Sequence, residues 1–131
     1  MSTRSTTHFR DVGAERPAAI VYRHSDGYPE GHGADLAAFL DEAGKLPDPR
    51  FGDPTYLAAK LVVWLARRFA TRYDPDTQTW APTGYLDFLS VGVCTADPGD
   101  IEYRYVMECG PGRPTVTTWH GYGDEWQEVA G

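Results

Sequence analysis

Residues 24–33 gather an unusual density of chemically capable side chains into one short stretch. Two imidazoles, two carboxylates and a phenol alternate there with glycine and proline: His24, Asp26, Tyr28, Glu30 and His32. Imidazoles titrate near neutral pH, and a neighbouring carboxylate can orient one of them for proton transfer. With His24 and His32 as acid and base and Asp26 orienting them, this pattern would suit a hydrolase that acts on nucleotides or phosphodiesters.

The same stretch could bind an anion without catalysing any reaction. Gly31 and Gly33 directly precede a predicted helix, whose first backbone amides lack partners within the helix. Those amides and the positive end of the helix dipole attract phosphate or carboxylate groups, and Arg23, His24 and His32 would add positive donors. The candidate ligand-binding residues are therefore Arg23, His24, Asp26, Tyr28, Gly31, His32 and Gly33.

Two other interpretations remain open for this stretch. Its histidines and aspartate form a His-x-Asp-x5-His pattern, and imidazole and carboxylate groups bind zinc and similar metals. The spacing matches no common metal-ligand pattern, so His24, Asp26 and His32 are weak metal candidates, and we predict no cofactor. Alternatively, the glycines and Pro29 only allow the chain to turn tightly, and Asp26 accepts hydrogen bonds from nearby backbone amides.

The elements that would position these side chains lie directly on either side. Residues 18–22 are apolar and predict a short strand. Apolar residues at helical spacing predict a helix over residues 34–43: Leu36, Phe39, Leu40 and Ala43. Gly44 follows, where a helix commonly terminates. Residues 24–33 are thus expected to form a loop between two rigid elements.

The rest of the chain predicts a second helix followed by strands. Asp53 and Pro54 form a helix start, and the helix is predicted to run to about Tyr73, with an apolar stripe from Leu57 to Phe69. Strands are predicted over residues 85–95, 101–109 and 115–120, with a short last strand over 126–129. Residues 85–95 are apolar on both faces, which favours a central strand, and a hairpin turn over 95–101 would pair them with the next strand.

We therefore expect a single α+β domain over residues 18–131. The order of its elements is strand, helix, helix and then strands, which favours a mostly antiparallel sheet with both helices on one face. Residues 1–17 are polar, so they are predicted to be flexible, with at most a short edge strand held by Phe9 and Val12.

Charge and cysteine content limit the partners and location of the chain. It has 131 residues, a net charge of −7 and an isoelectric point of about 4.9, so it is poorly suited to attract nucleic acid through its phosphates. Its longest apolar run, residues 61–66, is too short to span a bilayer.

Cys94 and Cys109 are predicted on strands and too far apart for a disulfide. Reduced thiols and a polar start without a signal-like apolar segment favour a cytoplasmic location.

Residues 22–33 also resemble a known signature. They read Tyr-Arg-His-Ser-Asp-Gly-Tyr-Pro-Glu-Gly-His-Gly, which is similar to a Tyr-x-His-Trp-Asp-Gly-Tyr-Pro-x-Gly-x-Gly motif, followed by a helix, in small phage-borne and bacterial proteins of unknown function. Ser25 replaces the tryptophan of that motif, and residues 100–106 resemble a second, weaker one. The resemblance implies a phage or mobile-element setting, in which small acidic proteins often bind host machinery or sequester small signals.

With no complete catalytic set, these features predict a small, acidic, non-enzymatic binding protein. We expect a phage-type accessory protein or host-defence antagonist that contacts a partner protein or an anionic small molecule, such as a nucleotide, through residues 24–33. We expect no membrane partner and no bulk nucleic-acid binding. Two alternatives are a hydrolase that uses the same loop and a structural phage component that self-associates as a homo-oligomer. Every interpretation that uses the loop requires its polar groups to point outward.

Overall fold

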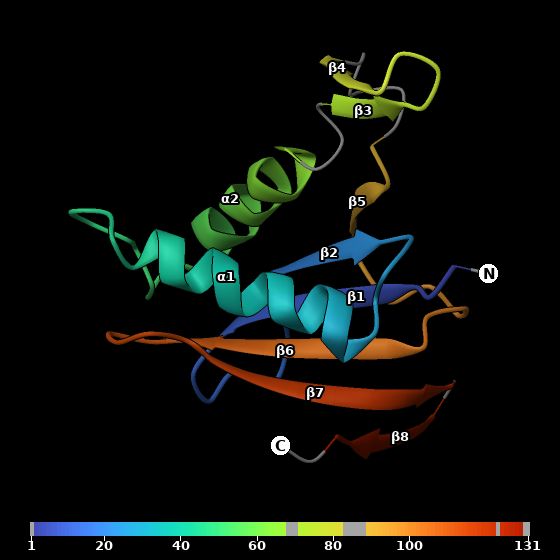
Figure 1. Cartoon of the computed structure of the whole chain (residues 1–131). Coiled ribbons are helices and arrows are strands. Elements are labelled where there is room, and N and C mark those ends of the chain that lie inside the picture. Colours follow the sequence, from blue (N-terminus) through green and yellow to red (C-terminus); the bar gives the residue numbers. More distant parts are fainter. Residues whose placement is uncertain (1, 68–70, 83–88, 123, 130–131) are drawn as a thin grey trace.

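A six-stranded sheet forms the body of the protein, and two helices pack on one of its faces (Figure 1). The structure is a computed structural model that describes residues 2–67, 71–82, 89–122 and 124–129. Its elements are β1 (Ser5–Asp11), β2 (Ala19–Arg23), the single π-helical turn η1 (Pro29–Gly33), α1 (Ala34–Ala43), α2 (Pro54–Ala66), β3 (Thr71–Asp74), β4 (Thr79–Pro82), β5 (Val91–Cys94), β6 (Tyr103–Cys109), β7 (Thr115–Tyr122) and β8 (Glu125–Glu128).

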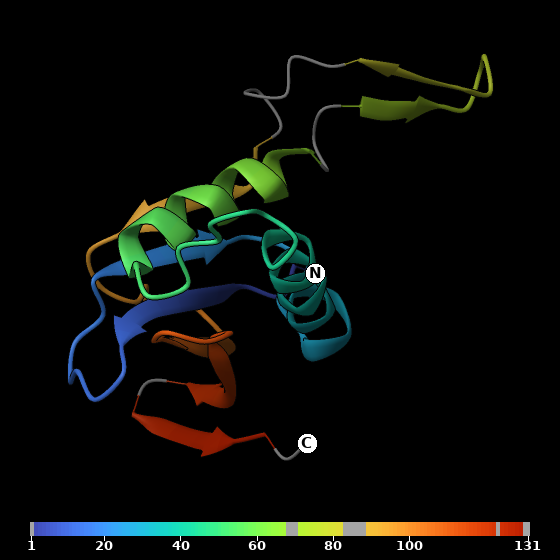
Figure 2. The same cartoon turned by 90° about the vertical axis from the view of Figure 1, so that its left-hand side faces the viewer.

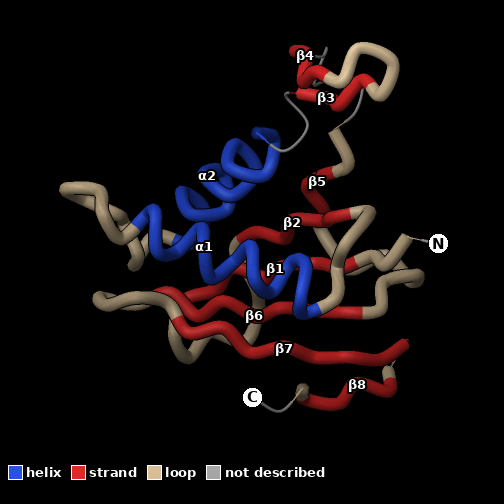
Figure 3. Tube along the Cα trace, in the orientation of Figure 1, coloured by secondary structure: helices blue, strands red, loops and turns tan. Residues whose placement is uncertain are grey.

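The strands of the main sheet lie in the order β5-β2-β1-β6-β7-β8 (Figure 3). Strands β1 and β6 are parallel, and the other neighbouring pairs are antiparallel. The short strands β3 and β4 form a separate hairpin beyond the C-terminal end of α2 (Figure 2). The predicted α+β class is confirmed, with a mostly antiparallel sheet that carries both helices on one face.

The core lies between the helices and the sheet. Alternate residues of each strand point toward the helices, where they meet the apolar stripes of α1 and α2. The fully buried members of this layer are Phe9, Leu57, Leu61, Leu65, Tyr105 and Met107. Burying one large apolar side chain contributes roughly 1.5–3 kcal/mol, so this layer holds both helices on the sheet. Helix α1 spans the residues that the apolar spacing predicted.

Strand β1 differs from the prediction for residues 1–17. Their polar composition predicts flexibility with at most an edge strand, but the structure places β1 between β2 and β6. Thr6 and Thr7 are 0% exposed. Thr7 bonds to His32 on the helix face of the sheet, and Thr6 bonds to Asp97 on the other face. At Thr6 and Thr7 hydrogen bonds take the place of apolar packing, so the polar composition alone predicts the wrong position for this strand.

Helix α2 is shorter than the sequence predicted. It ends at Ala66, whereas the sequence predicted that it runs to about Tyr73. Tyr73 instead lies on β3 opposite Trp80 of β4, with the two rings 5.4 Å apart. Aromatic residues favour strands, and cross-strand aromatic pairs stabilise hairpins. This pair favours the hairpin over further helical turns.

The strand predicted over residues 85–95 is confirmed only at its end, as β5, and residues 83–88 lie outside the described part of the chain. Strand β5 lies at the edge of the sheet, and it pairs with β2 while β6 pairs with β1. The predicted central strand and hairpin are therefore wrong. Residues 95–102 cross the sheet on the face opposite the helices, where Asp97 bonds to Thr6. Local patterns could not predict this contact, because the two residues are 91 positions apart.

Both cysteines carry free thiols, as predicted. Cys94 lies on β5 and Cys109 on β6, and strands β2 and β1 separate them. Neither α1 nor α2, nor any other helix among the described residues, is long and apolar enough to cross a bilayer.

Replacing Phe9 by alanine tests the position of β1. The side chain is 0% exposed and belongs to the core, so Phe9→Ala should lower the free energy of unfolding by roughly 3–5 kcal/mol, measured by urea denaturation. Val12 is 65% exposed, and the control Val12→Ala should change this free energy by no more than about 0.5 kcal/mol. Equally small effects of the two substitutions would mean that β1 is not part of the folded sheet.

Candidate functional site

The structure divides the 24–33 loop into an inward and an outward half. The loop leaves β2 and enters α1 through η1. The buried polar residues at this junction are Arg23, His32 and Asp35. The exposed ones are Asp26, Tyr28 and Glu30, and His24 is half-buried. Polar side chains of the predicted site therefore point in opposite directions, although Nη2 of Arg23 lies 3.9 Å from the Asp26 carboxylate and joins the two halves.

The inward half forms a buried hydrogen-bond network around Arg23. Its Nη1 donates to the carboxylate of Asp35 at 2.6 Å and to Nδ1 of His32 at 3.2 Å. The other ring nitrogen of His32, Nε2, lies 2.7 Å from the hydroxyl of Thr7. This network links the end of β2 to β1 and to the first turn of α1, so it fixes where α1 begins on the sheet.

The network determines the protonation of His32. A guanidinium only donates, so Nδ1 accepts and Nε2 carries the hydrogen that is donated to Thr7. Burial, and then the charge of Arg23, lower the pKa of His32 to about 3. The ring is therefore neutral at neutral pH, and it is 1% exposed. His32 does not fit its predicted roles as acid, base, metal ligand or ligand contact, because both ring nitrogens are engaged and solvent does not reach them.

Two glycines of the loop, Gly27 and Gly31, stand where the backbone passes too close to another segment for a side chain to fit. A side chain at Gly27 would place its Cβ 2.8 Å from the Thr3 carbonyl oxygen, and one at Gly31 would collide with the Asp26 carbonyl. The hydroxyl of Tyr105 donates to the Gly27 carbonyl at 2.7 Å. Asp26 itself has φ +57°, a left-handed conformation that aspartate tolerates better than most residues. These positions fit the predicted tight turn.

The predicted anion cradle at the start of α1 is closed by the chain itself. The amide of Gly31 donates to the Tyr28 carbonyl, and the amide of His32 donates to the Asp26 carbonyl at 2.8 Å. The amide of Ala34 donates to carbonyls within η1. The amides of Gly31, His32 and Ala34 therefore already have backbone partners, and they do not offer an open cradle to an anion.

The outward half places His24 near the N-terminal strand. Its Nδ1 accepts hydrogen bonds from the Tyr22 hydroxyl at 2.9 Å and from Nε of Arg4 at 3.3 Å. The Asp26 carboxylate is 59% exposed and accepts a hydrogen bond from Tyr28 at 3.3 Å. His24 and His32 thus bond to different residues on different sides of the loop. Across the described residues, no three imidazole, thiol or carboxylate groups gather where a metal could bind.

Sequence reasoning missed a second polar cluster, centred on Asp97. One carboxylate oxygen accepts from Thr6 and His8, both at 2.7 Å, and the other accepts from Arg104 at 2.7 Å. Burial alone would raise the pKa of Asp97, but hydrogen bonds from His8 and Thr6 and the charge of Arg104 outweigh it and lower the pKa to about 2. The cluster clamps residues 95–102 onto the sheet. In the sequence, the polar residues that alternate along β1 were the signal that could have indicated this cluster.

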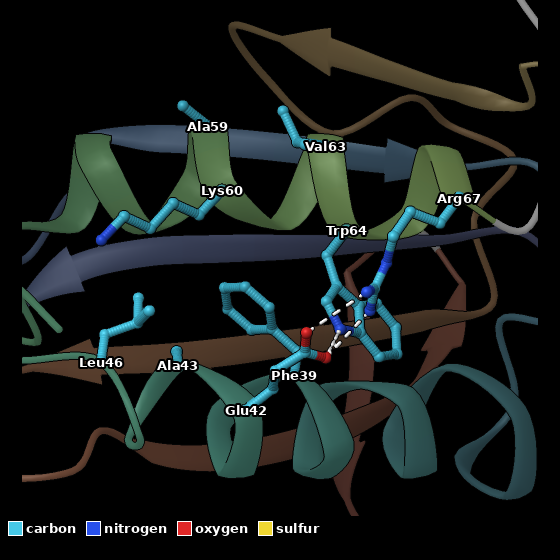
Figure 4. Close-up of a pocket in the computed structure, with 9 residues that line it drawn as sticks. All are labelled: Phe39, Glu42, Ala43, Leu46, Ala59, Lys60, Val63, Trp64 and Arg67. Atoms are coloured by element: carbon cyan, nitrogen blue, oxygen red, sulfur yellow. Dashed lines mark hydrogen bonds and ion pairs between the residues drawn. The ribbon is translucent and has the colours of Figure 1, made fainter.

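A groove between α1 and α2 is the second feature that the sequence did not indicate. It encloses about 430 Å³, and Phe39 of α1 and Trp64 of α2 lie in it with their rings 6.1 Å apart (Figure 4). Ala43 and Leu46 continue its apolar lining, and Leu46 is 45% exposed. The α-helical apolar spacing predicted that α1 packs on the sheet, but it gave no sign of the open groove beside it.

An ion pair fixes the aromatic wall of this groove. The carboxylate of Glu42 accepts two hydrogen bonds from Arg67, at 2.9 and 3.2 Å, and one from Nε1 of Trp64 at 2.7 Å (Figure 4). The hydrogen bonds from Arg67 and then Trp64 lower the pKa of Glu42. The Arg67 guanidinium also lies over the Trp64 ring, 5.3 Å from its centre. The indole is therefore held in one position on a surface where it could otherwise rotate.

Charge is distributed unevenly around the groove. Residues 54–73, which include α2, contain four basic residues and no carboxylate, although the whole chain has 12 basic and 19 acidic residues. Lys60 and Arg67 of α2 lie at the groove, and Glu42 is already neutralised by Arg67. Since Arg67 and Glu42 compensate each other, Lys60 is the groove-lining residue that gives the α2 side of the groove its positive charge.

Comparison with known proteins identifies no relative of this chain. No family model matches it, and neither a curated protein sequence nor a solved structure is similar to it.

The buried state of His32 predicts a specific dependence of stability on pH. Its folded pKa of about 3 lies below the ordinary histidine value of about 6.5. Between these values the unfolded chain binds a proton that the folded chain does not, so stability falls as the pH is lowered from about 6.5 toward 3. His32→Gln keeps a donor and an acceptor without titrating, and its free energy of unfolding should decline less over this range, measured by urea denaturation.

The control for this comparison is His120→Gln, which removes an exposed imidazole. It should retain the wild-type dependence on pH. If His32→Gln also kept the wild-type slope, the ring of His32 would not be held neutral by burial.

Proposed function

We propose that this protein is a non-enzymatic binding protein that captures an acidic amphipathic helix of a partner protein in the groove between α1 and α2. The observation that carries the proposal is the open apolar groove, whose Trp64 ring is held in place by Glu42 and Arg67. A phage-type accessory or host-defence antagonist role in the cytoplasm is the setting that we propose for this capture, following the motif resemblance.

The apolar lining supports a helical protein segment as the occupant. Amphipathic helices bind by laying an apolar face into a hydrophobic groove, and well-packed aromatic residues at the centre of an interface carry much of the binding energy. Phe39 is 3% exposed and packs edge-on against the Trp64 ring. The half-buried Trp64 supplies such an anchor, and Leu46 extends the apolar surface beyond α1. A helix seated between α1 and α2 would remove these side chains from water.

The charge around the groove supports an acidic partner. Lys60 bonds to the Pro49 carbonyl at 3.4 Å, and an ammonium group has three hydrogens, so it can also donate to a carboxylate. Lys60 and Arg67 border the groove, and complementary charge steers association and fixes orientation. Acidic residues on the polar face of the bound helix would meet Lys60, because the Arg67 guanidinium is already paired with Glu42.

The 24–33 loop has an indirect role in this proposal. The bonds from Arg23 to Asp35 and His32 fix the start of α1, and α1 forms one wall of the groove. The inward residues of the loop would therefore shape the binding surface without touching the partner.

A synthetic peptide pair tests the groove. We would label an amphipathic peptide of about 18 residues, with leucine and phenylalanine on one face and glutamate on the other, and a matched peptide with lysine in place of glutamate. The acidic peptide should bind, and Leu46→Glu and Lys60→Glu should each weaken its binding about tenfold or more, measured by fluorescence anisotropy. Its affinity should fall as salt is added.

The control is Val12→Glu, which places the same charge at a site that is 65% exposed and remote from the groove lining. It should leave the affinity for the acidic peptide unchanged. Binding of neither peptide, equal binding of both, or an equal loss in Val12→Glu would contradict the proposal.

A second candidate function retains the predicted anionic small molecule. A cavity of about 400 Å³ lies beside His24, with Tyr22, Ser90 and Gly92 in its lining. Since the Tyr22 hydroxyl and Arg4 both donate to Nδ1, Nε2 of His24 carries a hydrogen that an anion could accept. Arg4 also lies beside His24, and its own charge is compensated by Asp100 at 2.8 Å, so the hydrogen on Nε2 is the donor that this candidate requires.

This candidate predicts a thermal shift. A nucleotide that binds only the folded protein raises Tm by mass action, and His24→Ala should abolish the rise while the groove variant Leu46→Glu retains it. A panel of mononucleotides and cyclic dinucleotides in a thermal-shift assay is the measurement. No rise with any of them, or a rise that survives in His24→Ala, would exclude the cavity as a nucleotide site.

A further inference from the structure

The two edges of the six-stranded sheet differ in their protection against pairing with another strand. Strand β8 carries Glu125 and Glu128 at its ends, and charged side chains discourage edge-to-edge pairing. Strand β5 reads Val-Gly-Val-Cys and contains neither a charged residue nor a proline. Among the described strands, β2 is its one neighbour, so its outer backbone groups face away from the sheet.

Apolar side chains accompany this unprotected edge. Val93 of β5 is 75% exposed, more than any other large apolar side chain in the described residues. It lies opposite Val21, which is buried beneath the helices, so Val93 is on the same face of the sheet. Helix α2 contacts β5, and its Val63, which also lines the groove (Figure 4), is 68% exposed.

We propose that β5 pairs with β5 of a second copy of this chain, in antiparallel orientation, about a two-fold axis at Gly92. The sequence Val91–Gly92–Val93 reads the same in both directions, so this register places Val91 opposite the partner's Val93, and each such contact forms twice. The two sheets would become continuous, and the outer backbone groups of β5 would gain the hydrogen-bond partners that buried backbone requires. This self-complementarity is the reason to name a second copy as the occupant.

Charge gives the pairing a distinctive dependence on salt. Each copy carries a net charge of −7, while β5 itself has no charge. Repulsion between copies is long-range and is screened by salt, so self-association should strengthen as ionic strength rises. Binding of an acidic helix in the groove should instead weaken as ionic strength rises. The pairing of β5 does not depend on the proposed capture of that helix.

The size of the contact predicts a weak dimer. Strand β5 has four residues, and the flank of α2 adds a limited apolar area, so the interface lies at the small end of specific interfaces. We expect a dissociation constant on the order of micromolar.

Sedimentation velocity from about 1 to 500 μM in low and high salt tests the proposal. The wild-type chain should shift from monomer to dimer with concentration, more readily in high salt. Val93→Lys should weaken the dimer about tenfold or more, and Val12→Lys, at a similarly exposed valine, should not. A chain that stays monomeric throughout, or an equal loss in both variants, would overturn the proposal. So would a dimer that Leu46→Glu abolishes and Val93→Lys leaves intact, because the groove would then be the contact.

Cross-linking at the proposed axis tests the register without relying on loss of association. A Cβ at Gly92 would meet only a ring carbon of Tyr22, at 3.9 Å, and one at Gly112 would meet nothing within 4 Å. In a Cys94→Ser background, Gly92→Cys should form a disulfide-linked dimer on mild oxidation, seen on a non-reducing gel, because a residue on the axis faces its own copy within disulfide reach. Gly112→Cys is the control. Equal cross-linking at both positions, or none at Gly92→Cys, would overturn the register.

Discussion

The structure depends on the buried ion pair between Arg23 and Asp35. Their side chains are 4% and 7% exposed and 2.6 Å apart. Loss of one partner from such a pair leaves an uncompensated buried charge and costs about 3–5 kcal/mol. The pair joins the last residue of β2 to the first turn of α1, so the position of α1 on the sheet is set by electrostatics as well as by its apolar stripe. His32 completes the arrangement as a neutral ring between Arg23 and Thr7.

This constraint explains the composition of the 24–33 loop. The chain must leave β2, turn sharply and return so that His32 and Asp35 meet Arg23. The close approaches at Gly27 and Gly31 leave no room for side chains there. Much of the motif that suggested chemistry is therefore needed to build the turn. Its exposed carboxylate and phenol groups, Asp26 and Tyr28, bond to each other at the surface, where solvent reaches them.

Separate clamps on the two faces of the sheet leave particular surfaces open. Asp97 holds residues 95–102 on one face through Thr6, His8 and Arg104. On the other face, Arg23 fixes the start of α1, while α2 packs over β1, β2 and β5. Among the described residues, no strand pairs with the outer side of β5, and the groove between the helices stays open. Both proposed interactions use surfaces whose shape is set by contacts elsewhere in the fold.

The sequence by itself determined the elements whose residues repeat with a clear period. Helix α1 follows from apolar residues at helical spacing, β6 and β7 follow from alternation, and the loop lies where glycine and proline gather. It also located the one loop with many polar groups. Composition misled at β1, because buried threonines look the same in a sequence as exposed ones.

Tertiary structure alone decided which way those polar groups face. The inward position of His32 depends on Arg23 and Thr7, which belong to two different strands. The aromatic wall of the groove depends on Glu42 and Trp64, 22 positions apart. Partners this distant are brought together by strand order and helix packing, which no local pattern of residues encodes. Local residue patterns thus located the polar loop, and the packing of strands and helices decided which way its side chains point.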